Sequence, residues 1–333
     1  MIPVSQSRPL VSILIPAFNC EEWIEFAISS ALGQIWANKE IIVVDDGSSD
    51  GTLDVIRRFD GRIHWETGSN KGGGAARNRL LELSKGEWLQ YLDADDYLLP
   101  DKISRQLEFA RRHSDADIIC NQTLCERLID GKFVCTETRF PSRRDPWVLL
   151  ALWELPQTGG PIWKRAALEL VKGWRADQPC CQEHELYGRL LEAGCSFAFG
   201  EDCLAVYRVW DLGGRLVQRM ILEVPRQRLI ILDRMETFLS NKGEFTKERR
   251  QAVNDARHEL ARGLWQHDRD LAISILHRIR ESDRFFIPGN RPASPLSYRL
   301  AYRALGFRGA EWLANLRREF ASGFSRQAIQ GRS

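Results

Sequence analysis

Short apolar runs alternate with stretches of helical spacing through the first hundred residues. Apolar runs predict strands at residues 11–15, 40–44, 63–66 and 88–92. Apolar positions three and four residues apart predict helices at residues 21–32, 52–59 and 75–83. Because the strands alternate with helices, we expect an α/β protein with a mainly parallel sheet.

Strand patterns fade in the later part of the chain, where long helical patterns take over, for example at 215–239 and 247–279. We therefore predict two domains, an α/β domain over residues 1–214 and a helical region over residues 215–333. Residues 288–295 contain three prolines and a glycine and predict a linker within the helical region.

The 333 residues carry a formal net charge of +2, but the two parts of the chain differ in sign. Residues 1–210 carry a net charge of −7 and residues 211–333 one of +9. Residues 284–333 hold nine arginines and only two acidic residues, which makes this tail a candidate contact for an anionic surface. Nucleic acid is not expected as a partner, because the first part is acidic and no recognised nucleic-acid-binding module is present.

The sequence also bears on location. No apolar stretch approaches the roughly 20 residues that a membrane span needs, and residues 1–9 lack the apolar core of a signal peptide. The eight cysteines are scattered without a C-x-x-C pair, which suits neither a disulfide framework nor a structural zinc site. We therefore expect a cytoplasmic protein with reduced thiols.

An acidic loop follows the predicted strand 88–92. Asp93 and Asp95 are separated by one residue, a spacing that lets two carboxylates converge on a hard cation such as Mn²⁺ or Mg²⁺. Because such ions are commonly shared with substrate phosphates, the pair points to a nucleoside diphosphate ligand. The alternative is a solvated acidic loop that caps the next helix.

A second acidic pair, Asp45 and Asp46, follows the strand 40–44. These carboxylates could accept hydrogen bonds from a base N–H or from ribose hydroxyls, or could only cap a turn. A glycine-rich loop at 70–74 lies between the two acidic loops in the sequence. Since the carboxyl ends of parallel strands meet at one edge of a sheet, we expect the three loops to form one crevice.

Four motifs, taken in order, resemble the signature of glycosyltransferase family 2, which has the GT-A fold: Val11–Asn19, Glu40–Thr52, Asn70–Asn78 and Leu92–Asp96. The resemblance covers about residues 9–210 and is strongest up to residue 102. It implies a Rossmann-like mixed, mainly parallel sheet with flanking helices, followed here by the helical C-terminal region.

The resemblance also implies roles for single residues. In the matching positions, the residues that would bind the nucleotide sugar are Pro16, Ala17, Asn19, Asp45, Asp46, Arg77 and Ala94. Asp93 would reach both the ribose and the metal, and Asp95 would bind the metal through the diphosphate.

The segment that begins at Gln182 is similar to the family's Glu-Asp-x-Glu-Leu-x-x-Arg pattern. Aligning Leu186 and Arg189 places Glu183 where the catalytic aspartate usually stands. Gln182 then replaces the usual glutamate, so both positions depart from the pattern. A glutamate can still take a proton from an acceptor hydroxyl, because a general base needs reach and a suitable pKa. The alternatives are His184 as the base, or Glu183 as an acid that only stabilises the helix N-terminus.

Two further features are ambiguous. The motif Tyr207–Trp210 resembles the end of the family's catalytic domain, with Trp210 in the place of a frequent histidine and Arg208 as a candidate diphosphate contact. Trp163 and Trp174 could stack on a sugar acceptor, although a position in the core is the simpler interpretation.

In the tail, an amphipathic helix is predicted. Trp312, Leu313, Leu316 and Phe320 share one of its faces, and Arg317 and Arg318 lie on another. The apolar face could pack on the catalytic domain, or the helix could contact the inner face of a membrane, where its arginines would meet anionic lipids.

The resemblance implies an inverting transfer of a sugar from a nucleotide-diphosphate sugar to an acceptor hydroxyl, with Mn²⁺ or Mg²⁺ assisting the leaving group. We take UDP as the nucleotide, with GDP and dTDP as the alternatives. The expected acceptor is a saccharide or lipid-linked molecule, in cell-surface polysaccharide or glycolipid synthesis. The main alternative is a non-catalytic module that keeps the nucleotide crevice. A dehydrogenase is disfavoured because residues 72–74 lack the G-x-G-x-x-G spacing.

Overall fold

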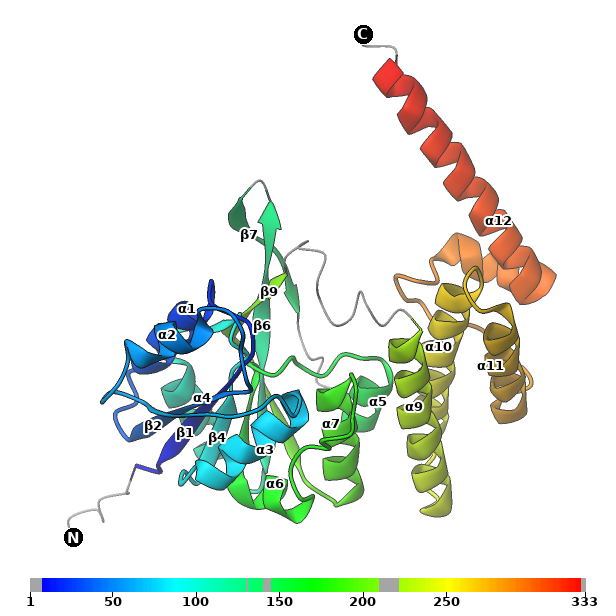
Figure 1. Ribbon diagram of the computed structural model, residues 1–333. Helices are drawn as coiled ribbons and strands as arrows, with labels where there is room; N and C mark the ends of the chain where they lie inside the picture. Colours follow the sequence, from blue (N-terminus) through cyan, green and yellow to red (C-terminus); the bar gives the residue numbers. More distant parts are fainter. Residues whose placement is uncertain (1–7, 130, 140–144, 210–221, 331–333) are drawn as a thin grey trace. The chain divides into compact units, whose positions relative to one another are not determined.

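The computed structural model describes residues 8–129, 131–139, 145–209 and 222–330, with the side chains of 136–139 and 318–330 left out. The chain divides into two compact units, residues 1–231 and 232–333 (Figure 1). The predicted domain boundary at residue 214 lies outside the described residues.

Unit 1 contains one mixed sheet and its flanking helices. Its strands are β1 (Val11–Ala17), β2 (Lys39–Asp45), β3 (His64–Thr67), β4 (Trp88–Tyr91), β5 (Tyr97–Leu98), β6 (Ile118–Ile129), β7 (Lys132–Arg139), β8 (Pro161–Lys164) and β9 (Phe197–Val209). Its helices are α1 (Ile24–Leu32), α2 (Thr52–Arg57), α3 (Gly73–Leu83), α4 (Lys102–Arg112), α5 (Pro146–Ala151), α6 (Arg165–Leu170) and α7 (Gln182–Glu192). The predicted alternation of strand and helix in the first hundred residues is confirmed.

The strand order is β3-β2-β1-β4-β8-β6-β9-β5, with β7 paired to β6. The strands β3, β2, β1 and β4 are parallel to one another, as expected for strands joined by helical crossovers. The second part contains antiparallel pairs, β4 with β8, β8 with β6, β6 with β7 and β9 with β5, beside the parallel pair β6 and β9. The predicted mixed α/β class is therefore confirmed.

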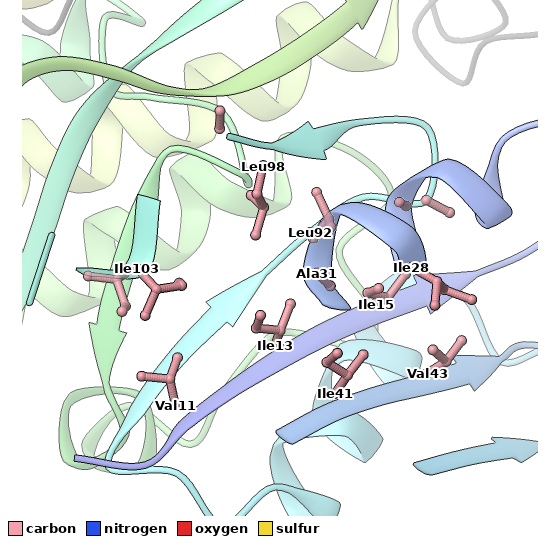
Figure 2. Close-up of a cluster of buried hydrophobic side chains, with 14 of the residues drawn as sticks. Val11, Ile13, Ile15, Ile28, Ala31, Ile41, Val43, Leu92, Leu98 and Ile103 are labelled. Carbon is pink, nitrogen blue, oxygen red and sulfur yellow. The ribbon is translucent and has the colours of Figure 1, made fainter. Parts of the chain in front are cut away.

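Alternate residues of β1 explain the main core (Figure 2). Val11, Ile13 and Ile15 are fully buried on the face that packs against Ile28 and Ala31 of α1. Burying an isoleucine side chain of this kind stabilises the fold by about 1.5–3 kcal/mol. The same cluster takes in residues of α2 and α4, whereas α3 contacts β1 and β2 without joining it and so covers the opposite face.

The parallel register places the candidate loops at one edge. Ala17 pairs with Asp45, so β1 and β2 end side by side. On the other side of β1, Leu14 pairs with Tyr91, and Leu92 N donates to Leu14 O at 2.9 Å. The chain therefore leaves β1, β2 and β4 in the same direction at neighbouring positions.

Unit 2 is helical. It contains most of α9 (Glu223–Asn241), α10 (Lys247–Leu264), α11 (Arg269–Ser282) and α12 (Leu296–Gln330). α12 is two helices joined at a kink, where Gly306 has φ 67°. In the part of the chain that is described, no helix is both long and apolar enough to span a membrane.

The helical pattern predicted over residues 247–279 forms two helices, α10 and α11. α10 ends in a turn in which Asp268 N donates to Leu264 O at 2.8 Å. The Asp268 side chain then accepts from Leu271 N and caps the start of α11. The apolar period continues across the turn because both helices bury residues in the same interior.

Candidate active site

The two aspartates after β2 have different surroundings. Asp45 is buried, and its carboxylate accepts from Thr67 Oγ1 at 2.6 Å and from Ser48 N at 3.3 Å. Asp46 accepts from the backbone N–H groups of Lys71 and Gly72, each at 2.8 Å. The Asp46 carboxylate therefore fixes the glycine-rich loop, and Gly72 supplies the left-handed backbone (φ 91°) that this loop requires.

The end of β1 is fastened to the same region. Ala17, which follows Pro16 in the strand, accepts from Asp46 N at 2.8 Å. Asn19 adopts a left-handed conformation (φ 47°), which asparagine tolerates better than most residues. Its Oδ1 accepts from Ser49 N at 2.8 Å. The loop that begins at Asp45 is thereby held against the end of β1.

A pocket of about 340 Å³ opens beside these loops, at the ends of β2 and β3 and the start of α3. Its lining includes Asp45, Asp46, Glu66, Thr67 and Lys71. The lining contains carboxylates as well as a lysine ammonium, which suits a polar ligand with donor and acceptor groups. Arg77 and the residues of β1 that the sequence predicted for the nucleotide are not part of this lining.

Arg77 joins two motifs that lie far apart in the sequence. Its Nη2 donates to Asp93 Oδ1 at 2.7 Å, and its Nη1 donates to Gln182 Oε1 at 2.6 Å. The guanidinium carbon lies 4.9 Å from the ring centroid of Trp174. Burial alone would lower the pKa of Arg77, but the negative charges of Asp93 and Glu183 outweigh it and raise the pKa. The Asp93 loop and the start of α7 thus meet at one cation.

Close backbone packing brings α7 to this position. Asn78 of α3 accepts from Trp174 N and donates to Trp174 O, both at 2.8 Å. A Cβ at Gly173 would lie 2.4 Å from Asn78 Oδ1, and one at Gly74 would lie 2.5 Å from Arg175 O. The two glycines therefore allow α3 and the segment before α7 to approach one another.

Glu183 lies in the first turn of α7, where its Oε1 accepts from Thr158 Oγ1 at 2.5 Å. His184, the alternative base, is buried with its ring stacked on Trp153 at a centroid distance of 3.4 Å. Burial, and secondarily the charge of Arg228, holds the pKa of His184 well below its usual value. These surroundings favour Glu183 over His184 as a proton acceptor.

The loop after β4 presents the second acidic pair. Asp96 N donates to Asp93 O at 3.1 Å and closes a tight turn, in which Ala94 is buried and Asp93 and Asp95 are half-buried. The Asp96 carboxylate accepts from Arg208 N at 2.9 Å. Among the described residues, no group of three or more His, Cys, Asp or Glu side chains is arranged to hold a metal ion. The candidate ligands remain the two carboxylates of Asp93 and Asp95.

The guanidinium of Arg208 is enclosed by aromatic rings. Its carbon lies 4.3 Å from the ring centroid of Phe26, 4.7 Å from that of Tyr97 and 4.5 Å from that of Phe133. Its Nε donates to Glu126 at 3.5 Å, and Glu126 also accepts from Tyr97. A diphosphate at the predicted position would compete with these contacts for Arg208.

The structure gives Trp163 and Trp174 places in the interior. Both side chains are buried, and Trp174 packs edge-on against Tyr91 as well as on Arg77. Their burial favours the core interpretation over stacking on an acceptor.

Sequence reasoning missed Thr158 as a partner of Glu183, because a lone threonine in a loop carries no pattern. It also missed the contact between Gln182 and Arg77, although each residue lies in a segment that resembles a family motif.

The parallel half-sheet with acidic strand ends, extended by antiparallel strands, defines a GT-A type glycosyltransferase fold. Residues 12–154 match the model of the family described as Glycosyl transferase family 2. This part of the chain is therefore similar to glycosyltransferase family 2.

Two relatives are similar in sequence to part of this chain. A putative teichuronic acid biosynthesis glycosyltransferase TuaG of Bacillus subtilis is 40% identical over 113 residues, 33% of this chain and 45% of the relative. The UDP-Glc:alpha-D-GlcNAc-diphosphoundecaprenol beta-1,3-glucosyltransferase WfaP of Escherichia coli is 44% identical over 102 residues, 30% of this chain and 41% of the relative. The alignments thus span less than half of either relative.

Solved structures show the same fold over more of the chain. S. aureus TarS 1-349 in complex with UDP-GlcNAc aligns with TM-score 0.56 and 15% identity, over 82% of this chain and 91% of that chain. The mannosyltransferase PcManGT from Pyrobaculum calidifontis, in complex with GDP-Man and Mn2+, aligns with TM-score 0.53 and 17% identity, over 92% of this chain and 84% of that chain. At these identities the likeness concerns the fold alone.

Proposed function

We propose that the protein is an inverting glycosyltransferase that moves a sugar from a nucleotide-diphosphate sugar to an acceptor hydroxyl. The observation that carries the proposal is the bridge made by Arg77, which donates to Asp93 and to Gln182 at once. This bridge supports the proposal, because it joins the loop of Asp93 to Gln182, the residue before the candidate base Glu183. An inverting transfer needs a donor site and a base on the two sides of one anomeric carbon.

The donor set of Asp93 and Asp95 fits a divalent cation. Both are carboxylates of one turn, and hard cations such as Mn²⁺ and Mg²⁺ prefer oxygen ligands and accept substrate phosphates as further ligands. Asp93 Oδ1 also accepts from Arg77, so the loop holds cationic charge next to the place proposed for the diphosphate. A bound cation would supply neutralisation of the charge that develops on the leaving diphosphate.

The chain's own residues provide the rest of the reaction. The acceptor O–H gives its proton to the Glu183 carboxylate, and the acceptor oxygen forms a bond to the anomeric carbon. The bond between that carbon and the diphosphate oxygen breaks, and the nucleoside diphosphate leaves with the electron pair. Thr158 donates to Glu183 Oε1 and so orients the carboxylate. Asp46 keeps the glycine-rich loop in place beside the pocket that Asp45 and Asp46 line.

The donor and acceptor are proposed by class. The fold neighbours were solved with UDP-GlcNAc and with GDP-Man, which supports a nucleotide-sugar donor; we propose UDP as the nucleotide. The relatives' names refer to teichuronic acid and to a diphosphoundecaprenol-linked sugar. These names support a saccharide or lipid-linked acceptor in cell-surface polysaccharide or glycolipid synthesis. A cytoplasmic location stays a prediction.

Nucleotide binding and transfer are tested separately. Thermal unfolding is measured with UDP, GDP, CDP and dTDP, each with and without Mn²⁺; a ligand at a hundred times its dissociation constant stabilises by about 2.7 kcal/mol. We expect a metal-dependent shift with one nucleotide. Asp95→Asn should abolish the shift, and the exposed Asp115→Asn should keep it.

The corresponding sugar nucleotides then serve in a transfer assay. Glu183→Gln should abolish transfer while keeping nucleotide binding, and Glu192→Gln at the end of the same helix should keep both. Near wild-type transfer by Glu183→Gln would refute the assignment of the base. If the wild-type protein binds the nucleotide but transfers sugar to none of the acceptors tested, the result would favour a non-catalytic module. The departures from the family pattern at Gln182 and Glu183 are the reason for considering this alternative.

A further inference from the structure

The loop before β8 carries Thr158, the hydrogen-bond donor to the candidate base. Thr158 is 1% exposed, and its Oγ1 donates to Glu183 Oε1 at 2.5 Å. One turn further along α7, the hydroxyl of Tyr187 donates to Pro156 O at 3.0 Å. Residues 156–160, which we call the threonine loop, therefore contact α7 at two positions.

The other side of the threonine loop faces two glutamines. Gln90 of β4 donates from Nε2 to Gly159 O at 3.2 Å, and Gln106 of α4 donates from Nε2 to Gly160 O at 2.9 Å. Both glutamines are fully buried. Because a buried carbonyl without a donor costs about as much as a lost hydrogen bond, these two amides stabilise the loop where it is.

A lysine sets the direction of both amides. Lys102, the first residue of α4, is fully buried, and its Nζ donates to the Oε1 atoms of Gln90 and Gln106. Each amide oxygen is thereby turned towards the amine, and each amide nitrogen faces the threonine loop. Lys102 Nζ also donates to Gly160 O at 3.4 Å. We call these three side chains the lysine network.

Keeping this amine in the core has a cost. The three acceptors of Lys102 Nζ are carbonyl oxygens, which carry no formal charge. Burial disfavours the charged amine and holds the pKa of Lys102 well below its usual value. A buried polar network whose members are hydrogen-bonded makes the structure around it rigid, and this network ends at the threonine loop.

The threonine loop is also closely packed. A Cβ at Gly160 would lie 2.7 Å from Pro156 Cβ and 3.1 Å from Asn121 O. Gly160 N donates to Gln157 O at 2.8 Å and closes a turn around Thr158. Because the turn is this tight, a displacement of the Gly160 carbonyl also displaces the threonine hydroxyl.

We propose that the lysine network is a positioning device for the base: it holds the threonine loop so that the Thr158 hydroxyl keeps the Glu183 carboxylate in one orientation. The inference rests on the proposed function, in which Glu183 takes the proton of the acceptor. The network lies outside the lining of the pocket at Asp45 and Asp46. Its loss should therefore slow transfer and leave donor binding unchanged.

The test is a double-mutant cycle in the transfer assay, with Lys102→Met, Thr158→Val and both changes together. Because small displacements of a catalytic group slow a reaction strongly, we expect each single change to lower kcat by about tenfold, with the KM of the donor unchanged. Both changes act on one contact, so the double variant should be no slower than the slower single variant. An unchanged kcat in Lys102→Met, or losses that multiply to about a hundredfold, would overturn the inference.

Hydrogen exchange gives a readout that does not depend on activity. The amides of residues 157–160 should exchange faster in Lys102→Met than in the wild type, because the loop has lost the amine that orders its donors. Arg105→Met, at an exposed position of the same helix, should change neither exchange nor kcat. Exchange in Lys102→Met as slow as in the wild type would overturn the inference. A wild type that transfers no sugar would instead refute the proposed function.

Nucleotide binding separates this role from misfolding. The thermal shift caused by the nucleotide should be the same in Lys102→Met as in the wild type, because the donor site is not changed. Gln90→Met removes the donor to Gly159 O and takes the place of Lys102→Met in the cycle if that variant does not fold. It should lower kcat in the same non-additive way with Thr158→Val; independent losses would overturn the inference.

Discussion

Replacing Arg77 by lysine tests the bridge on which the candidate active site depends. The guanidinium donates to Asp93 at 2.7 Å and to Gln182 at 2.6 Å, and its carbon lies 4.9 Å from the ring centroid of Trp174. A lysine ammonium is a compact charge on a flexible stem and cannot reproduce the planar fork. Arg77→Lys therefore keeps the charge and removes the bridge.

The magnitude follows from these contacts. The loss of one buried hydrogen bond to a charged group costs about 1.5–3 kcal/mol. A weaker contact with Trp174 adds about 0.5–1 kcal/mol. The free energy of unfolding of unit 1 should fall by about 2–4 kcal/mol, which for a domain of this size lowers the midpoint of thermal unfolding by about 5–15 °C.

The assay compares Arg77→Lys with Arg79→Lys on the same helix. Arg79 is half-exposed and pairs with Glu66 and Glu82, so its replacement should leave the midpoint near that of the wild type. Amide hydrogen exchange should also show faster exchange in the first turn of α7 in Arg77→Lys only. Equal midpoints and equal exchange in the two variants would refute the reasoning.

Three further outcomes follow from single contacts. Asp46→Asn replaces an acceptor oxygen with an amide donor that faces Lys71 N or Gly72 N. It should therefore lower the free energy of unfolding by about 2–4 kcal/mol in the absence of any ligand. A midpoint of thermal unfolding as unchanged as that of the exposed control Asp60→Asn would show that Asp46 does not anchor the loop. Thr158→Val removes the donor that orients the Glu183 carboxylate and should lower kcat; an effect on KM alone would contradict the role. Burial, aided by Arg262, lowers the pKa of His258 to about 3, so below about pH 6.5 only the unfolded chain takes up its proton, and stability should fall by up to about 1.4 kcal/mol per pH unit down to about pH 3. His258→Phe should flatten this dependence and the exposed His267→Phe should not; equal slopes would refute it.

Much of the fold could be predicted because it follows from local patterns. The apolar runs that became β1, β2 and β4 are strands buried on both faces, and such strands are continuous in the sequence. The break after Leu264 could not be predicted from the period alone, because α10 and α11 both bury apolar residues at helical spacing.

The candidate site also has features that the sequence predicted and features that it did not. The sequence located Asp45, Asp46, Asp93 and Asp95, since acidic residues directly after core strands are recognisable without any knowledge of packing. It did not distinguish Asp46, which holds the glycine-rich loop, from its neighbour Asp45, which faces Thr67. That difference depends on the direction of each side chain relative to loops that are distant in the sequence.

The sequence by itself determined the alternation of strands and helices, the acidic ends of two parallel strands and the positive charge of the tail. These are properties of composition and short-range periodicity, which act wherever the segment lies. Only the tertiary structure decided that Gln182 and Asp93 share Arg77, that Thr158 contacts Glu183 and that His184 is buried against Trp153. Those contacts join residues from distant segments or select one side of a helix, and they exist only after the whole sheet and its helices have packed.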